Sequence, residues 1–231
     1  MWVPKKMLKT GVKGVKNSFK RRLLVDTKAS VGIGALIIFI AMILIAGVTA
    51  NVLIQTMNSL QEQAMRTGEE TLRDISGGLR ITHVNGYTNT SHITQLSIFV
   101  SPTAASDNID LTYAYISLSD TSKKVILSYN SNCFNSSVSN GLFGTVNASN
   151  LSATTYGLMV VRDTDNSCSA SSPTINGNDL VVLLVNTSKC FSGIGTRTEV
   201  FGNVYPEYGI SGVIGFTTPS AFVDTIVDLQ P

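Results

Sequence analysis

The chain has 231 residues, of which 43% are apolar and 14% are charged. This composition excludes an intrinsically disordered protein, which combines high charge with few apolar residues. The formal net charge of +2 hides an asymmetry, because nine of the 17 Lys and Arg residues lie in residues 1–29. The remaining chain is net acidic, which indicates a terminal segment with a partner or fate of its own.

An apolar run, Val31–Ile54, follows the basic segment, and no charged residue lies between Lys28 and Glu62. As a helix this run would be ~36 Å long, enough to span the hydrocarbon core of a bilayer. It is apolar on every side, whereas a helix on a soluble core shows a polar face. The run therefore predicts a membrane helix, with residues 1–29 in the cytoplasm and the rest of the chain outside.

The basic segment has three interpretations. A nucleic-acid patch is disfavoured, because no aromatic or groove-reading motif accompanies it. A secretory signal would be cut after Val48-Thr49-Ala50, although the apolar run is long for a signal core. A leader removed before the apolar run would be cut after Lys28-Ala29, and the mature chain would begin at Ser30.

The helical pattern continues beyond the apolar run. Apolar or small residues recur at three- or four-residue spacings, or their multiples, on one face: Leu53, Met57, Leu60, Ala64, Leu72 and Ile75. Gly77-Gly78 is a typical helix stop. The pattern predicts one helix from Val31 to Ser76, ~69 Å long, with one half suited to lipid and the other to a watery surface against a partner.

From Leu79 onward, short runs rich in β-branched and apolar residues alternate with Ser, Asn, Asp and Gly. This pattern predicts an antiparallel β-sandwich of immunoglobulin-like type, and hence an α+β chain. The expected strands are Leu79–Val84, Ile93–Val100, Ile109–Leu118, Lys124–Tyr129, Tyr156–Val161, Leu180–Val185, Arg197–Val204, Gly212–Phe216 and Ala221–Leu229. Residues of about 130–179 have a weaker strand signal, and we expect long, solvent-facing loops there.

The three cysteines, Cys133, Cys168 and Cys190, lack zinc-binding spacing. Outside the cell a disulfide is permitted, and three pairings are open, each leaving one thiol over. Five N-x-S/T sequons lie on the expected outer side: Asn89, Asn135, Asn147, Asn150 and Asn186. We expect glycans at some of them.

No catalytic constellation is recognisable in the sequence. The two histidines, His83 and His92, occupy strand-like or loop positions, and no nucleophile elbow, phosphate loop or zinc-protease motif is present. Residues 162–166 resemble the start of a calcium loop but lack its later Gly and Glu, which favours a solvated acidic turn. We therefore expect no enzyme activity, no cofactor and no metal centre.

Three segments closely resemble the archaellins, the archaeal flagellins. The first is the apolar helix Gly32–Thr56 with its continuation Leu60–Gly68. The second is Asn108-Ile109-Asp110-Leu111, and the third is Arg197–Pro219, which resembles the closing strands of the family. The resemblance covers Ser30 to Pro231 apart from roughly residues 120–178.

The resemblance implies a leader, residues 1–29, that a prepilin-peptidase-like enzyme cuts between Ala29 and Ser30. Residues 30–78 would then form the filament core, and residues 79–231 would form the outer β-sandwich domain. The implied core-packing positions are Ile33, Leu36, Ile37, Ile40, Ile43, Leu44, Ala46, Ala50 and Leu53.

The implied function is that of a structural subunit of the archaellum, a swimming filament on the cell surface. The implied partners are further flagellin copies, a membrane motor platform and an ATPase, with the membrane as host before assembly. The leader is longer than is usual for the family, and Ala29 stands where Gly is commoner. The alternative is a subunit of an adhesive, pilus-like filament. Only the carboxy-terminal motif argues against this alternative.

Overall fold

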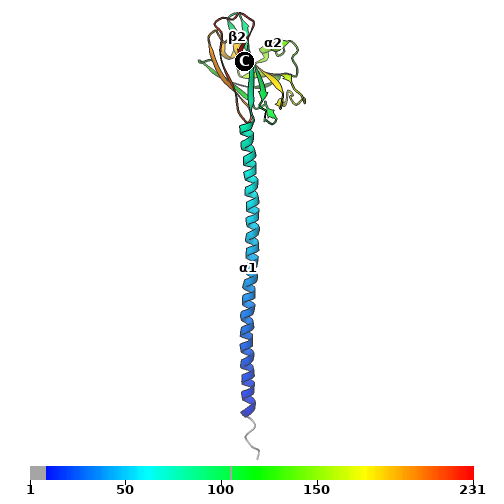
Figure 1. The fold of residues 1–231 in the computed structure, drawn as a ribbon, viewed down its shortest axis with the longest axis vertical. Helices are drawn as coiled ribbons and strands as arrows, with labels where there is room; N and C mark the ends of the chain where they lie inside the picture. The colour runs from blue at the N-terminus through cyan, green and yellow to red at the C-terminus, as the bar shows by residue number, and fades with distance from the viewer. Residues whose placement is uncertain (1–8, 105) are drawn as a thin grey trace, which may run out of the picture. The chain divides into compact units, whose positions relative to one another are not determined.

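A computed structural model describes residues 9–104 and 106–231, with side chains from Val31 onward. The chain divides into two compact units, one up to Met65 and one from Arg66 to Pro231. The first unit is helical, and the second holds the last turns of the same helix together with all the strands (Figure 1).

Helix α1 runs without interruption from Lys9 to Ser76. Its end confirms the stop predicted at Gly77-Gly78. Gly78 has a φ of +146°, which only glycine adopts readily, and a Cβ there would collide with the backbone of Ile210. The helix begins earlier than predicted, because the expectation was anchored on the apolar run. The cleavage pair Ala29–Ser30 falls inside α1, at positions whose side chains lie outside the described part.

The strands of the second unit form a nine-stranded sheet in the order β10-β9-β4-β5-β6-β8-β2-β1-β11. Their bounds are β1 Leu79–Asn89, β2 His92–Pro102, β4 Tyr115–Ser119, β5 Lys124–Asn135, β6 Thr155–Arg162, β8 Leu180–Asn186, β9 Glu199–Tyr205, β10 Gly212–Thr217 and β11 Ile226–Gln230. A separate two-stranded sheet pairs β3 Ile109–Asp110 with β7 Thr174–Ile175. The predicted α+β class, a long apolar helix followed by a domain of antiparallel strands, is confirmed. One pair departs from the pattern, because β5 and β6 run parallel.

The large sheet rolls so that its two ends meet. The Gln230 side chain, from terminal strand β11, accepts a hydrogen bond from the Gly215 amide at 3.0 Å and donates to the Val213 carbonyl at 3.3 Å in β10, at the other end. A side-chain amide thus takes the place of a neighbouring strand. The rolled sheet encloses the main core, which includes Leu96, Ile98, Ile116, Leu183 and Val204.

A second, smaller core lies on the other face of the β2-β8-β6 region. Here Val146 and Leu151 pack with Cys133, Met159 and Val182. The covering segment carries the short helices α2 Gly141–Gly144 and η1 Ala148–Asn150. Strand β8 is therefore buried on both faces, which explains why its sequence is a continuous apolar run rather than an alternation.

Two expectations need correction. Residues 130–179 are not simply solvent-facing loops, because β5 extends to Asn135 and residues such as Val146 and Leu151 are buried. The single strand expected over Ile109–Leu118 is broken into β3 and β4 by a turn at Leu111–Ala114. The hydroxyl of the fully buried Tyr156 donates to the carbonyls of Leu111 and Ala114, at 3.1 Å each, and fixes this turn.

We predict that Tyr156→Phe destabilises the β-domain by ~1–3 kcal/mol, because it leaves buried carbonyls without their donor. Urea unfolding of the detergent-solubilised chain, followed by circular dichroism, measures the loss. Tyr113→Phe is the matched control, since Tyr113 is 70% exposed and its change should stay within ~0.5 kcal/mol. Equal midpoints for Tyr156→Phe and the parent would contradict this role of the hydroxyl.

Candidate functional site

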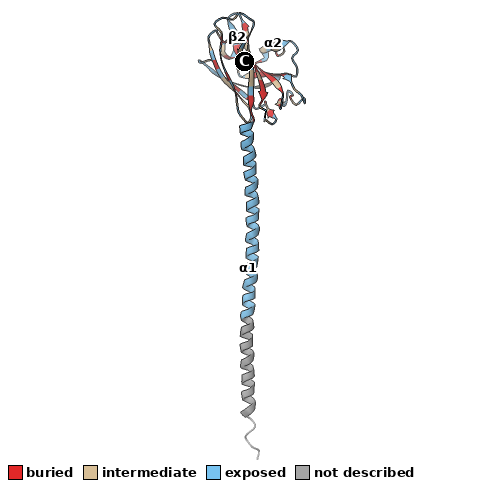
Figure 2. Cartoon of the chain, viewed as in Figure 1, coloured by how far each residue is buried: buried red, intermediate tan, exposed pale blue. Residues whose placement is uncertain are grey.

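The most unusual surface of the molecule is the apolar part of α1. Fifteen large apolar side chains between Val31 and Ile54 are exposed in the single chain, and even the most covered of them, Ile40, is 48% exposed. In Figure 2 the described part of α1 is pale blue throughout, whereas the buried residues gather in the β-domain. A soluble monomer exposes single, scattered apolar side chains, whereas this helix exposes a continuous apolar surface.

The expected core-packing positions all lie on this exposed surface: Ile33, Leu36, Ile37, Ile40, Ile43, Leu44, Ala46, Ala50 and Leu53. Phe39, Met42, Ile45 and Val48 are equally exposed on other sides of the helix. The choice of the core-packing positions therefore stays a prediction.

The helix segment Val31–Ser76 is long and apolar enough to span a membrane, as a signal sequence near an amino terminus also is. The hydroxyls of Thr49, inside the apolar part, and Thr56, just beyond it, donate to the carbonyls of Ile45 and Val52, four residues earlier, at 2.9 and 3.0 Å. These two polar groups are satisfied within the helix, so neither demands water.

The last turns of α1 are fastened to the β-domain by a neck, which comprises residues 73–79, 103, 106 and 208–210. The Arg73 guanidinium lies 3.8 Å from the centre of the Tyr208 ring. The Tyr208 hydroxyl donates to the Asn108 carbonyl at 2.7 Å, and the ring also lies against Gly77. A stacked guanidinium of this kind combines a cation–π attraction with packing.

Backbone hydrogen bonds complete the neck. Gly78 donates to the Ser106 hydroxyl at 2.8 Å, and its carbonyl accepts from the Thr103 amide at 3.0 Å. Ile210 donates to the Gly77 carbonyl and accepts from the Leu79 amide, at 2.9 Å each. The glycines that end the helix are thus tied to two separate loops of the domain.

An acidic cluster joins the turn after β6 to the residue that precedes β8. Carboxylate oxygens of Asp163, Asp165 and Asp179 all lie within 4.8 Å of one another, and Asp179 is buried. Oxygen ligands of this kind suit hard cations. Each carboxylate already accepts hydrogen bonds, and the bond from the Asn176 amide, followed by that from Ser167, lowers the pKa of Asp165 to about 2.

The sequence placed only two of these carboxylates in one turn, because Asp179 follows many residues later. Residues 162–166 are mostly exposed, and backbone amides hold the carboxylates of the turn in place.

The model of the archaeal-type flagellin family matches residues 29–216, which is most of the chain. The chain belongs to this family. Flagellin B2 of Methanocaldococcus jannaschii is 41% identical over 207 residues, covering 88% of this chain and 95% of that relative. Flagellin B4 of Pyrococcus abyssi is 38% identical over 216 residues, covering 88% and 99%.

Solved structures agree with this assignment. The crystal structure of archaeal flagellin FlaB1 from Methanocaldococcus jannaschii superimposes with a TM-score of 0.61 at 32% identity, covering 67% of this chain and 97% of that one. The archaeal flagellum of Methanospirillum hungatei strain JF1 has the same fold, with a TM-score of 0.60 at 12% identity over 87% and 99% of the two chains. The chain is a structural filament subunit, as predicted, and the adhesive pilus subunit is not favoured.

The sequons of this flagellin differ in their exposure. Asn89, Asn147 and Asn150 are exposed. Asn135 is half-buried and donates from its amide to the Thr145 carbonyl at 2.6 Å. Asn186 is buried, donates to the Ala148 carbonyl at 2.8 Å and caps the short helix α3 Thr187–Phe191 by accepting from Lys189. Its amide nitrogen, the atom that would carry a glycan, is already engaged in the fold.

The cysteines are free, buried thiols in the structure. Cys133 belongs to the second core, whereas Cys168 and Cys190 lie at the edge of the main core. Burial raises the pKa of all three thiols, that of Cys168 to about 12. The disulfide expected from the sequence, with its three open pairings, stays a prediction.

We predict that glycans occupy Asn147 and Asn150 but not Asn186. Glycopeptide mass spectrometry of filaments from native cells measures the occupancy. Asn147→Gln should lower the subunit mass, whereas Asn186→Gln should leave the glycan mass unchanged and cost ~1 kcal/mol of stability through the lost helix cap. A glycan on Asn186, or an unchanged mass for Asn147→Gln, would contradict this reading.

Proposed function

We propose that this flagellin polymerises into the archaeal swimming filament through the apolar part of α1, with the β-domains at the filament surface. The observation that carries the proposal is the exposure of the fifteen large apolar side chains in residues 31–54. Leaving them in water would cost roughly 20–45 kcal/mol, at about 1.5–3 kcal/mol for each side chain. The helix therefore needs an apolar environment at every stage.

Two environments meet this need, one before assembly and one after it. A lipid bilayer hosts the precursor, with the basic segment on the cytoplasmic side. Moving the helix from lipid into a bundle of helices gains little hydrophobic free energy, so close packing must favour the bundle. Gly34 and Gly47 have open space where a Cβ would stand, and Ala46 and Ala50 are four residues apart. Small residues at such spacing let helix backbones approach closely.

The basic segment is proposed to be a leader that is cut between Ala29 and Ser30 by a prepilin-peptidase-like enzyme. The family match begins at residue 29, which supports a boundary there. Cutting at this point retains the whole apolar helix on the mature subunit. The membrane motor platform and the ATPase are proposed as partners on the strength of family membership.

We predict that Ile40→Asp abolishes filaments, because an unpaired carboxylate in a dry helix bundle is very costly. Electron microscopy of cells that make only this flagellin measures filament number and length. Ile40→Leu, which keeps volume and polarity, should assemble normally. Normal filaments from Ile40→Asp would exclude a core built from this face.

We further predict that the subunit in sheared filaments begins at Ser30. Intact mass and amino-terminal sequencing measure the start, and loss of the only Trp, Trp2, removes Trp fluorescence as a check. A start at Asn51 would mean ordinary secretion with removal of the apolar helix, and it would overturn the proposed polymerisation.

A further inference from the structure

The outer face of the sheet is covered on one half and uncovered on the other. Over β2, β8 and β6, the segment with α2 and η1 forms the second core. Over β4, β5, β9 and β10 no such segment of the described chain lies on the sheet, and outward side chains alternate with buried ones, although Ser117 in β4 is itself buried. We call this second half the open face, and its large members are Tyr115, Ile126, Phe201, Tyr205 and Val213.

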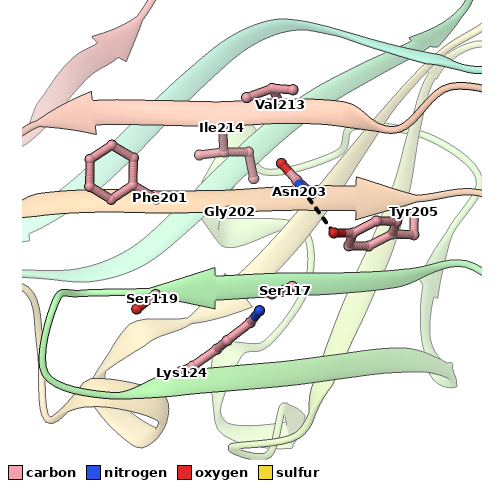
Figure 3. A pocket seen from close by; sticks show the side chains of 9 residues that line it. All are labelled: Ser117, Ser119, Lys124, Phe201, Gly202, Asn203, Tyr205, Val213 and Ile214. Atoms are coloured by element: carbon pink, nitrogen blue, oxygen red, sulfur yellow. Dashed lines mark hydrogen bonds between the residues drawn. The ribbon is translucent and has the colours of Figure 1, made fainter.

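The open face carries both apolar and polar side chains, and it is hollowed. Register places Val213, Asn203, Ser117 and Ile126 in one row across the four strands, and Gly215, Phe201, Ser119 and Lys124 in the next. Val213 and Phe201 are 64% and 50% exposed. The small residues between the large ones leave a shallow hollow of about 420 Å³, shown in Figure 3.

The walls of the hollow are held in place. Tyr115 and Tyr205 are stacked with their ring centres 4.7 Å apart, and Asn203 donates to the Tyr205 hydroxyl at 3.0 Å. Lys124 is the charged residue that lines the hollow, and in Figure 3 its side chain points toward Ser117. Glu199 lies on the same face but outside the lining.

A complementary knob stands elsewhere on the domain, in the loop of residues 218–225. Val223 at its tip is 89% exposed, the highest value for a large apolar side chain in the described part. The loop is not loose, because Phe222 packs toward the main core and the Thr88 hydroxyl donates to the Asp224 carbonyl at 2.8 Å. The carboxylate of Asp224, next to the tip, is exposed.

We propose that the 218–225 loop of one subunit inserts Val223 into the hollow of the open face on a second copy of this chain, with Asp224 facing Lys124. This inference rests on the proposed polymerisation and adds a contact between β-domains to the contact between helices. The knob is an exposed valine beside one acid, and the hollow offers apolar contact from Val213 and Phe201 beside one base. The two surfaces therefore match in charge, and each supplies apolar contact to the other. Because knob and hollow are different surfaces, each copy keeps one of each free for the next copy, which is the type of contact that an open helical polymer requires.

A charge-exchange experiment tests the pairing in intact filaments. Lys124→Glu and Asp224→Lys each place like charges in contact and should speed the loss of filament mass on heating about three- to tenfold, measured by light scattering. The double variant restores opposite charges and should return the rate close to that of the parent. Both residues are exposed, so the fold of the single chain should be unaffected, which circular dichroism checks. Unchanged rates for the single variants, or no recovery in the double variant, would overturn the proposal.

Cross-linking gives an independent readout. Oxidised filaments with Val223→Cys and Ser119→Cys should yield a ladder of covalent oligomers on a non-reducing gel. Val223→Cys with Asn178→Cys, an exposed position outside the open face, is the control and should yield none. Monomers alone, or a product that stops at the dimer, would contradict a repeating contact between knob and hollow. Since filaments are present in every arm, these failures would leave polymerisation through α1 untouched.

Discussion

The whole molecule is organised around an apolar helix surface that water does not tolerate. Fifteen large side chains in residues 31–54 lie in the open, and the two hydroxyls of Thr49 and Thr56 are turned inward to helix carbonyls. Apart from Asn51, the side chains of residues 31–54 therefore suit an apolar neighbour. An apolar environment favours this helix surface, and water disfavours it. A chain that keeps the helix needs such an environment.

The β-domain has the opposite property, because it buries its own apolar side chains. Its sheet rolls until Gln230 bonds with β10, and the main core is enclosed without help from a neighbour. A polymer subunit benefits from this division of labour. In the proposed filament the helix would supply apolar contact, and the surface loops of the domain would be freer to vary. The two halves of the outer face differ: a segment with short helices covers one half, and no segment in the described part of the chain covers the other.

The sequence predicted the elements with periodic patterns well. The apolar run, its amphipathic continuation and the glycine stop placed the end of α1, and alternation or apolar runs located most strands. Tertiary contacts decided the rest. The run Ile109–Leu118 looks like one strand, but the hydroxyl of Tyr156, far along the chain, fastens a turn inside it. Likewise, the polar character of residues 130–154 conceals the few apolar residues, among them Val146 and Leu151, that cover the sheet.

The candidate site shows the same limit. Family resemblance supplied the helix positions, whereas local spacing could not bring Asp179 to Asp163 and Asp165, nor show that the Asn186 amide is consumed by the Ala148 carbonyl. Such contacts depend on which distant loops the fold brings together, and short-range sequence patterns carry no information about that. Sequons and acidic turns therefore need the fold before they can be interpreted.

The neck has a mechanical consequence. A joint in which Arg73 stacks on Tyr208 and both Gly77 and Gly78 bond to the domain offers no free swivel between the last helical turns and the strands. A twist of these last turns is therefore passed to the strands, and drag on the strands is passed back to these turns. In a rotating polymer, each β-domain would then turn together with the last turns of its own helix.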